Sequence, residues 1–143
     1  MSGDQMIAAL VAFVADPTDV TTLRDLYTAT QDFDALSEAD QTRVIPTMFR
    51  VMERWPEADL GKPGPLVHAI ESLDVSIYGE MLAESVRRRP MYLNLWMVNR
   101  ILNENPPDSD KWLSLLRDVT LDPSATADAK EEAAGYLDHQ AGG

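Results

Sequence analysis

The stretch "SDKWLSLLRDVTLDPSATADAKEEAAGYLDHQ", residues 109–140, decides the fold. Its first half repeats tryptophan and leucine at helical spacing, and its second half repeats alanine in the same way. The Asp-Pro-Ser segment between them ends the first helix, because proline lacks a backbone N–H and clashes with the preceding turn. Two short helices joined by a short loop pack as antiparallel neighbours. The stretch therefore predicts a helical hairpin.

Helical periodicity extends outward from this hairpin over almost the whole chain, and no segment shows the sustained alternation of a strand. Proline and glycine divide the chain into eight expected helices, over residues 4–15, 19–30, 38–55, 65–73, 76–88, 90–103, 109–120 and 124–140. The leucine-rich helix followed by an alanine-rich one resembles a HEAT-like repeat unit. We therefore predict an all-α fold of stacked antiparallel hairpins, an α-α superhelix. Because the repeat has no fixed period, a helical bundle stays open as the alternative.

The length of 143 residues is typical of one domain, and we expect a single helical domain over residues 1–143 with a frayed tail at 141–143. The absence of cysteine excludes disulfides and thiolate chemistry. The apolar run near the N-terminus lacks the positive charge of a signal peptide, and no segment approaches the roughly 20 apolar residues of a membrane span. We expect a cytoplasmic protein that does not bind membranes.

The strongest bulk property is charge: 24 acidic residues against 12 basic ones give a net charge of −12. A field of that sign repels phosphate backbones and anionic lipid, so nucleic acid is a poor partner. A basic protein surface is attracted instead, and its association is accelerated. An acidic surface that serves only solubility is the alternative, and the sequence leaves it open.

The segment "GKPGPLVHAIESL", residues 61–73, contains candidates for a phosphate loop or a metal site. A phosphate loop needs a strand before it and Lys-Ser or Lys-Thr after its last glycine, and neither is present. His68 and Glu71 share a helix face, but a zinc site needs three or four ligands and the only other histidine is His139. We predict a helix start, with Gly61 and Gly64 in the turn and Pro65 at the first helical position. No catalytic, metal or cofactor site is expected.

The segment "MYLNLWMVNRILN", residues 91–103, is apolar almost all round, so we expect it in the centre of the core with Trp96 as a core aromatic. Its polar exceptions are Asn94, Asn99, Arg100 and Asn103. Either Arg100 and Asn99 clamp a neighbouring loop or the helix of His68, or these polar residues line a concave groove. Just before it, "RRRP" at 87–90 ends a helix. We interpret its arginines as partners of the helix dipole and of nearby carboxylates, since no basic stripe extends from them.

Three short sequence motifs resemble those of a known family. The chain contains "PGPLVHAIE" at 63–71, Ser85, Arg88 and Pro90 in the spacing S-x-x-R-x-P, and "LWMVNRILN" at 95–103. In this order they resemble a family of small helical bacterial immunity proteins of polymorphic-toxin and contact-dependent growth inhibition systems. The resemblance covers under a third of the chain. It implies that the protein is not an enzyme and that it binds a cognate toxin domain in a 1:1 complex.

The family-motif residues are either scaffold or interface, and they are His68, Glu71, Arg88, Trp96, Asn99 and Arg100.

Two acidic segments are candidate toxin-binding loops, since toxins that cut nucleic acid are basic near their active sites. The first contributes Asp32, Phe33, Asp34, Glu38 and Asp40, and the second contributes Trp55, Glu57 and Asp59. An aromatic side chain among carboxylates is typical of an interface hot spot, although Phe33 is equally able to pack into the core. The sequence thus predicts an immunity protein that neutralises a basic toxin domain by direct contact. A helical-repeat adaptor for another protein is the alternative.

Overall fold

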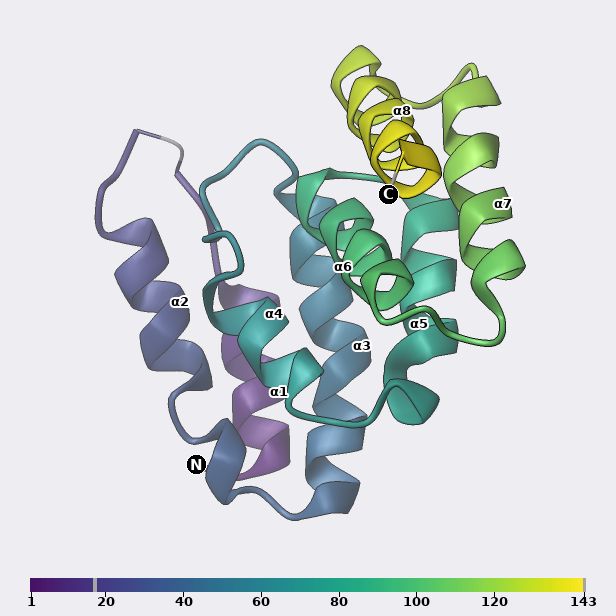
Figure 1. The fold of residues 1–143 in the computed structure, drawn as a ribbon. Coiled ribbons are helices and arrows are strands. Elements are labelled where there is room, and N and C mark those ends of the chain that lie inside the picture. Colours follow the sequence, from purple (N-terminus) through teal and green to yellow (C-terminus); the bar gives the residue numbers. More distant parts are fainter. Residues whose placement is uncertain (17, 143) are drawn as a thin grey trace. The chain divides into compact units, whose positions relative to one another are not determined.

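In the computed structural model, residues 1–16 and 18–142 are described, and they form helices with no strand among them (Figure 1). The prediction of an all-α fold with eight α-helices is confirmed. The elements are α1 Gly3–Ala12, α2 Thr22–Thr30, the 3-10 helix η1 Phe33–Ala35, α3 Glu38–Arg54, α4 Gly64–Glu71, α5 Val75–Arg88, α6 Tyr92–Asn103, α7 Ser109–Leu121 and α8 Ala127–Gly142.

The chain divides into two compact units, Met1–Met81 and Leu82–Gly143, with the boundary inside α5. That the whole chain forms one domain stays a prediction. Within the described part of the chain, no helix has both the length and the apolar character that crossing a bilayer requires.

Local side-chain chemistry explains where several helices begin. Ser2 and Gln5 form a reciprocal cap on α1: the Gln5 amide donates to Ser2 Oγ at 3.1 Å, and the Ser2 amide donates to Gln5 Oε1 at 2.7 Å. Ser37 caps α3, because its hydroxyl accepts from the Asp40 amide at 3.2 Å. These bonds satisfy backbone amides that have no partner within the helix.

The second helix begins later than the sequence predicted. We expected a start at Asp19 with Thr18 or Asp19 as the cap, but α2 begins at Thr22. The Asp19 carboxylate accepts instead from the amide and hydroxyl of Thr21, both at 2.8 Å. Asp and Thr favour such local turns as strongly as helix caps, so the two uses look alike in a sequence. Residues 18–21 therefore belong to the loop before α2.

The turn before α4 confirms the helix-start interpretation of residues 61–73. Gly61 and Gly64 both adopt positive φ, 87° and 77°. A Cβ added to Gly61 lies 2.3 Å from the Cα of Gly64, so this position has no room for a side chain. The helix begins at Gly64, and Pro65 occupies its first turn, where a missing N–H leaves no bond unmade.

In the first unit, α1 packs against α2 and α3, and α4 packs against α2 and α3. The core between these helices is aliphatic and methionine-rich, with fully buried Met6, Leu10, Leu26, Met48, Phe49, Leu66 and Ile70. Arg54 at the end of α3 fastens the end of α1, because its Nη2 donates to the Leu10 carbonyl at 2.9 Å. That carbonyl lies in the last turn of α1, where helical partners run out.

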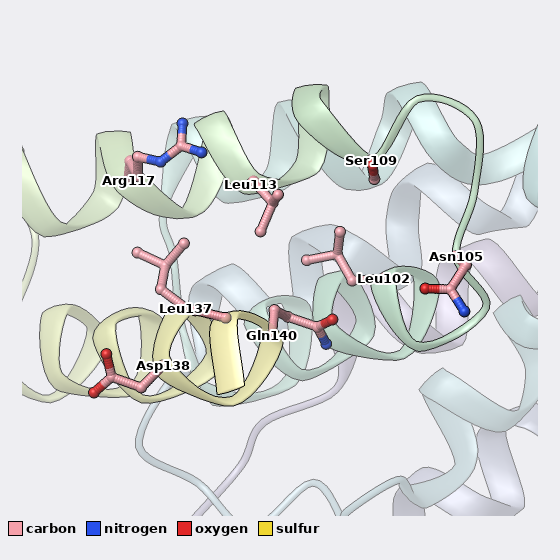
Figure 2. Close-up of a pocket in the computed structure, with 9 residues that line it drawn as sticks. Leu102, Asn105, Ser109, Leu113, Arg117, Leu137, Asp138 and Gln140 are labelled. Carbon is pink, nitrogen blue, oxygen red and sulfur yellow. The ribbon is translucent and has the colours of Figure 1, made fainter. Parts of the chain in front are cut away.

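In the second unit, α7 packs chiefly against α8, and α6 packs against both (Figure 1). The helices α7 and α8 run antiparallel (Figure 2), so the predicted hairpin over 109–140 is confirmed. Trp112, Leu115, Leu116, Ala129 and Ala133 are buried in it. The loop between the helices is held by Asp122, whose carboxylate accepts from the Ser124 amide at 2.8 Å.

The expected frayed tail differs in part from the structure. The last helix, α8, continues through Gly142, which includes two residues of the tail predicted at 141–143. Residue 143 lies outside the described residues.

Candidate binding surfaces

The first predicted binding loop contains only two freely exposed carboxylates. Phe33 is buried, with 2% of its surface exposed, so its expected role as a projecting aromatic anchor is wrong and its core alternative is correct. Asp32 accepts from the N-terminal amine at 3.3 Å, and Asp40 pairs with Arg43 at 3.3 Å. Asp34 and Glu38 remain exposed.

The two predicted binding loops lie at opposite ends of α3. The first extends into the first turn of α3, where Glu38 and Asp40 lie, and the second follows Arg54. A helix of 17 residues spans about 25 Å at roughly 1.5 Å per residue. The structure therefore does not bring the two acidic segments together.

The second predicted loop meets the loop before α2, which contains none of the predicted binding residues. Asp59 lines a hollow of about 160 Å³ together with Asp16, Asp19 and Val20, which belong to the loop before α2. We call these four residues the loop surface. All four are exposed, and Val20 is 95% exposed. The structure thus places an apolar side chain among three carboxylates, of which Asp59 lies far from the other two in the sequence.

Hydrogen bonds hold the carboxylates of the loop surface in place. The Thr18 amide and hydroxyl donate to Asp16 Oδ1 at 2.9 Å and 2.7 Å, and the Thr22 hydroxyl fastens the Asp16 backbone to the start of α2. The Thr21 amide and hydroxyl lower the pKa of Asp19 below its ordinary value, so this carboxylate is ionised at neutral pH. The Gly61 amide donates to Asp59 at 3.0 Å. The negative charges therefore have fixed positions.

Trp55 begins the same turn as Asp59 but does not project from it. The residue is half-buried, and the Arg54 guanidinium lies 5.9 Å from the centre of its ring. Its indole Nε1 is buried and has no hydrogen-bond partner among the described residues. Glu57 in this turn is exposed. Of the three residues predicted from this segment, the two acids are accessible and the aromatic is largely covered.

The two predicted metal candidates on α4 lie on a surface helix face. His68 is exposed, and Glu71 is half-buried. Within residues 1–16 and 18–142, no group of three or more acidic, histidine or cysteine side chains is placed to hold a metal ion. The accessible imidazole is therefore available for a partner contact.

The polar residues of α6 mainly hold the second unit together. Gln140 Nε2 donates to Asn99 Oδ1 at 2.7 Å and to Asn103 Oδ1 at 2.9 Å, so these asparagines clamp α8. Asn94 is fully buried, accepts from the Met91 amide at 2.8 Å and donates to Ser85 Oγ at 3.1 Å. Asn99 does hold a neighbouring element, but that element is α8, so the predicted partner, a loop or the helix of His68, is wrong.

Trp96 and Arg100 form a partly exposed pair on the same helix. The guanidinium of Arg100 lies 4.8 Å from the centre of the Trp96 ring, within the range of a cation–π contact. Trp96 is half-buried, so the expectation of a core aromatic is wrong; Trp112, 2% exposed, takes that role. Arg88 is exposed and lies 3.9 Å from Glu84, in agreement with the predicted ion pairing.

A groove of about 480 Å³ lies between α6, α7 and α8 (Figure 2). Leu102, Leu113 and Leu137, one from each helix, point into it. Asn105, Ser109 and Gln140 lie toward one end, and Arg117 and Asp138 lie at the other. Leu113 and Leu137 follow the helical spacing of the hairpin, but both remain half-exposed, which spacing alone does not reveal.

No protein family, curated protein or solved structure matches the chain. The resemblance to immunity proteins consequently rests on the three short sequence motifs alone and stays a prediction.

Proposed function

We propose that this chain is an immunity protein that neutralises a cognate toxin domain by direct contact, in a 1:1 complex in the cytoplasm, with no catalysis of its own. The observation that supports this most is the loop surface, where the exposed Val20 lies among Asp16, Asp19 and Asp59. An apolar contact surrounded by charge is the usual plan of a protein interface. The resemblance in the family-motif residues supplies the class of partner.

Charge and packing have separate roles in this proposal. The net charge of −12 attracts a basic toxin domain and raises its rate of association, and salt screens this effect. The apolar contact of Val20 forms only after docking, so it affects dissociation more than association. Neutralisation follows because an acidic partner occupies the basic surface that a nucleic-acid-cutting toxin uses to hold phosphates.

The test begins with the toxin domain encoded beside the gene for this chain. We expect cells that produce the toxin domain to grow only when this chain is co-produced, and light scattering of the purified mixture to give the mass of a 1:1 complex. In stopped-flow measurements the association rate should fall at least about tenfold between low salt and 0.5 M salt. If this chain does not rescue growth and forms no complex with that domain, the proposal is wrong.

A further inference from the structure

We infer that the groove between α6, α7 and α8 binds an uncharged, leucine-type segment of a polypeptide. The inference rests on the proposed function, because it takes the occupant to be part of a protein partner. The groove and the loop surface belong to different compact units, and the residues of neither line the other.

The floor of the groove selects for apolar side chains. Leu102, Leu113 and Leu137 converge on it from three helices, so a charged group seated among them loses its hydration (Figure 2). The charged lining residues, Arg117 and Asp138, lie at one end of the groove and not on this floor. An apolar cavity of about 150 Å³ is large enough for benzene. The groove, at about 480 Å³, therefore has room for more than one aliphatic side chain.

The charge of the groove is balanced, unlike that of the chain as a whole. Its only charged lining residues are Arg117 and Asp138, which cancel, whereas the chain carries −12. Neither side chain has an ion-pair partner among the described residues. Because the two charges cancel, the lining as a whole favours neither a strongly basic nor a strongly acidic occupant.

Neutral hydrogen-bonding groups at one end fit peptide units. The side chains of Ser109 and Asn105 make no hydrogen bond within the described part of the chain, and Gln140 uses only its Nε2. Together they offer a hydroxyl, a carboxamide and a free Oε1. A peptide backbone presents uncharged donors and acceptors beside its side chains, so a polypeptide segment satisfies this end while its leucines occupy the floor.

The test uses the full chain with methyl-labelled leucines and the blocked peptide N-acetyl-Gly-Leu-Leu-Gly-amide as the probe. We expect saturable NMR shifts at the methyl groups of Leu102, Leu113 and Leu137, with a Kd that changes less than about twofold between 0.05 and 0.5 M salt. Replacing one leucine of the peptide by lysine, or by aspartate, should weaken binding at least about tenfold, because either charge is buried among leucines.

A matched pair of variants locates the site. Ala141 lines the groove and Ala134 does not, and both are exposed residues of α8. A141F should weaken peptide binding at least about tenfold by filling the groove, whereas A134F should leave it unchanged. Binding that survives A141F, prefers a charged peptide or produces no saturable shift overturns the inference.

Two further results separate the possible explanations. If hexanamide saturates the same methyl groups more tightly than the peptide does, the groove takes a small molecule and the inference fails. If the peptide binds but the toxin domain does not associate, only the proposed function is wrong. If the toxin domain associates in a salt-dependent way but the peptide does not bind, only the inference about the groove is wrong.

Discussion

Gln140 donates a hydrogen bond from its side-chain amide to Oδ1 of Asn99 at 2.7 Å, and this bond joins α8 to α6. Asn99 is 8% exposed, so its oxygen has little access to water if the donor is removed. We expect Gln140→Ala to lower the free energy of unfolding by roughly 1–3 kcal/mol. The neighbouring exposed His139 provides the control, and His139→Ala should change it by less than about 0.5 kcal/mol. Urea unfolding followed by circular dichroism measures both, and equal midpoints contradict the role assigned to the clamp.

The two tryptophans of the second unit should differ in their contribution to stability. Trp112 is 2% exposed, so Trp112→Ala should cost roughly 3–5 kcal/mol by leaving a cavity. Trp96 is half-buried beneath Arg100, so Trp96→Ala should cost only about 1–2 kcal/mol, including the lost cation–π contact. Denaturant unfolding of the two variants decides the order. A larger loss for Trp96→Ala restores the core role that the sequence predicted for it.

Replacing glycine by alanine should change the stability of the protein differently at Gly61, Gly64 and Gly135. Gly61→Ala should destabilise the protein by at least about 2 kcal/mol, since it combines positive φ with a Cβ that collides with Gly64. Gly64→Ala has open space but the same backbone strain, so about 1–2 kcal/mol is expected. Gly135 lies inside α8 in open space, and Gly135→Ala should stabilise by about 0.5–1 kcal/mol. Thermal unfolding of the three variants tests the order.

Much of the fold was predictable because it depends on local chemistry. The hairpin over 109–140 follows from the spacing of Trp112, Leu115 and Leu116 and from the break at Asp122-Pro123, and the start of α3 follows from Ser37. The burial of Phe33 and the half-exposure of Trp96 depend on which helices pack against them, which periodicity does not specify.

The candidate site was less predictable for the same reason. The sequence indicated Asp59, but it joins Asp16 and Asp19 only after α2 and the turn before α4 have packed. A local pattern marks the missed loop: "DPTDV" at 16–20 is rich in turn formers and ends in a valine that no helical stripe includes.

The stability contributed by the turn between α7 and α8 should depend on pH. Hydrogen bonds from the Ser124 hydroxyl, and then from its amide, hold the pKa of Asp122 below its ordinary value of 3.8. A carboxyl group whose pKa is lower in the folded state stabilises the fold above pH 3.8, and that stability is lost as the pH falls through the folded-state pKa. In an NMR titration, Ser124→Ala should raise the pKa of Asp122 toward 3.8, because the hydroxyl donor is removed.

Ser114 provides the control for this titration, since it is an exposed serine of α7. Ser114→Ala should leave the pKa of Asp122 unchanged. If Ser124→Ala also leaves it unchanged, the hydroxyl bond does not cause the shift.

The last prediction decides which end of α3 contacts the toxin domain. We expect the loop surface to make the contact, because Val20 is 95% exposed there, whereas Phe33 at the other end is buried. Val20→Lys should raise the dissociation rate at least about tenfold by replacing the apolar contact with a charge. The double change Asp34→Lys and Glu38→Lys should slow association only by the amount that the change in net charge causes, and it should leave the dissociation rate unchanged. It adds two units per residue and changes the net charge from −12 to −8.

The matched control carries the same charge on α8, through Asp128→Lys and Glu131→Lys, where both acids are exposed. Long-range steering depends on the charge distribution over the surface, so the two double variants should slow association to a similar extent if neither pair touches the partner. If the Asp34 and Glu38 double variant loses much more of its association rate than the control, and Val20→Lys binds normally, the interface lies at the η1 end of α3. Because Val20 is almost fully exposed, Val20→Lys should have the same melting temperature as the unmodified chain. Any loss of binding then comes from the interface and not from unfolding.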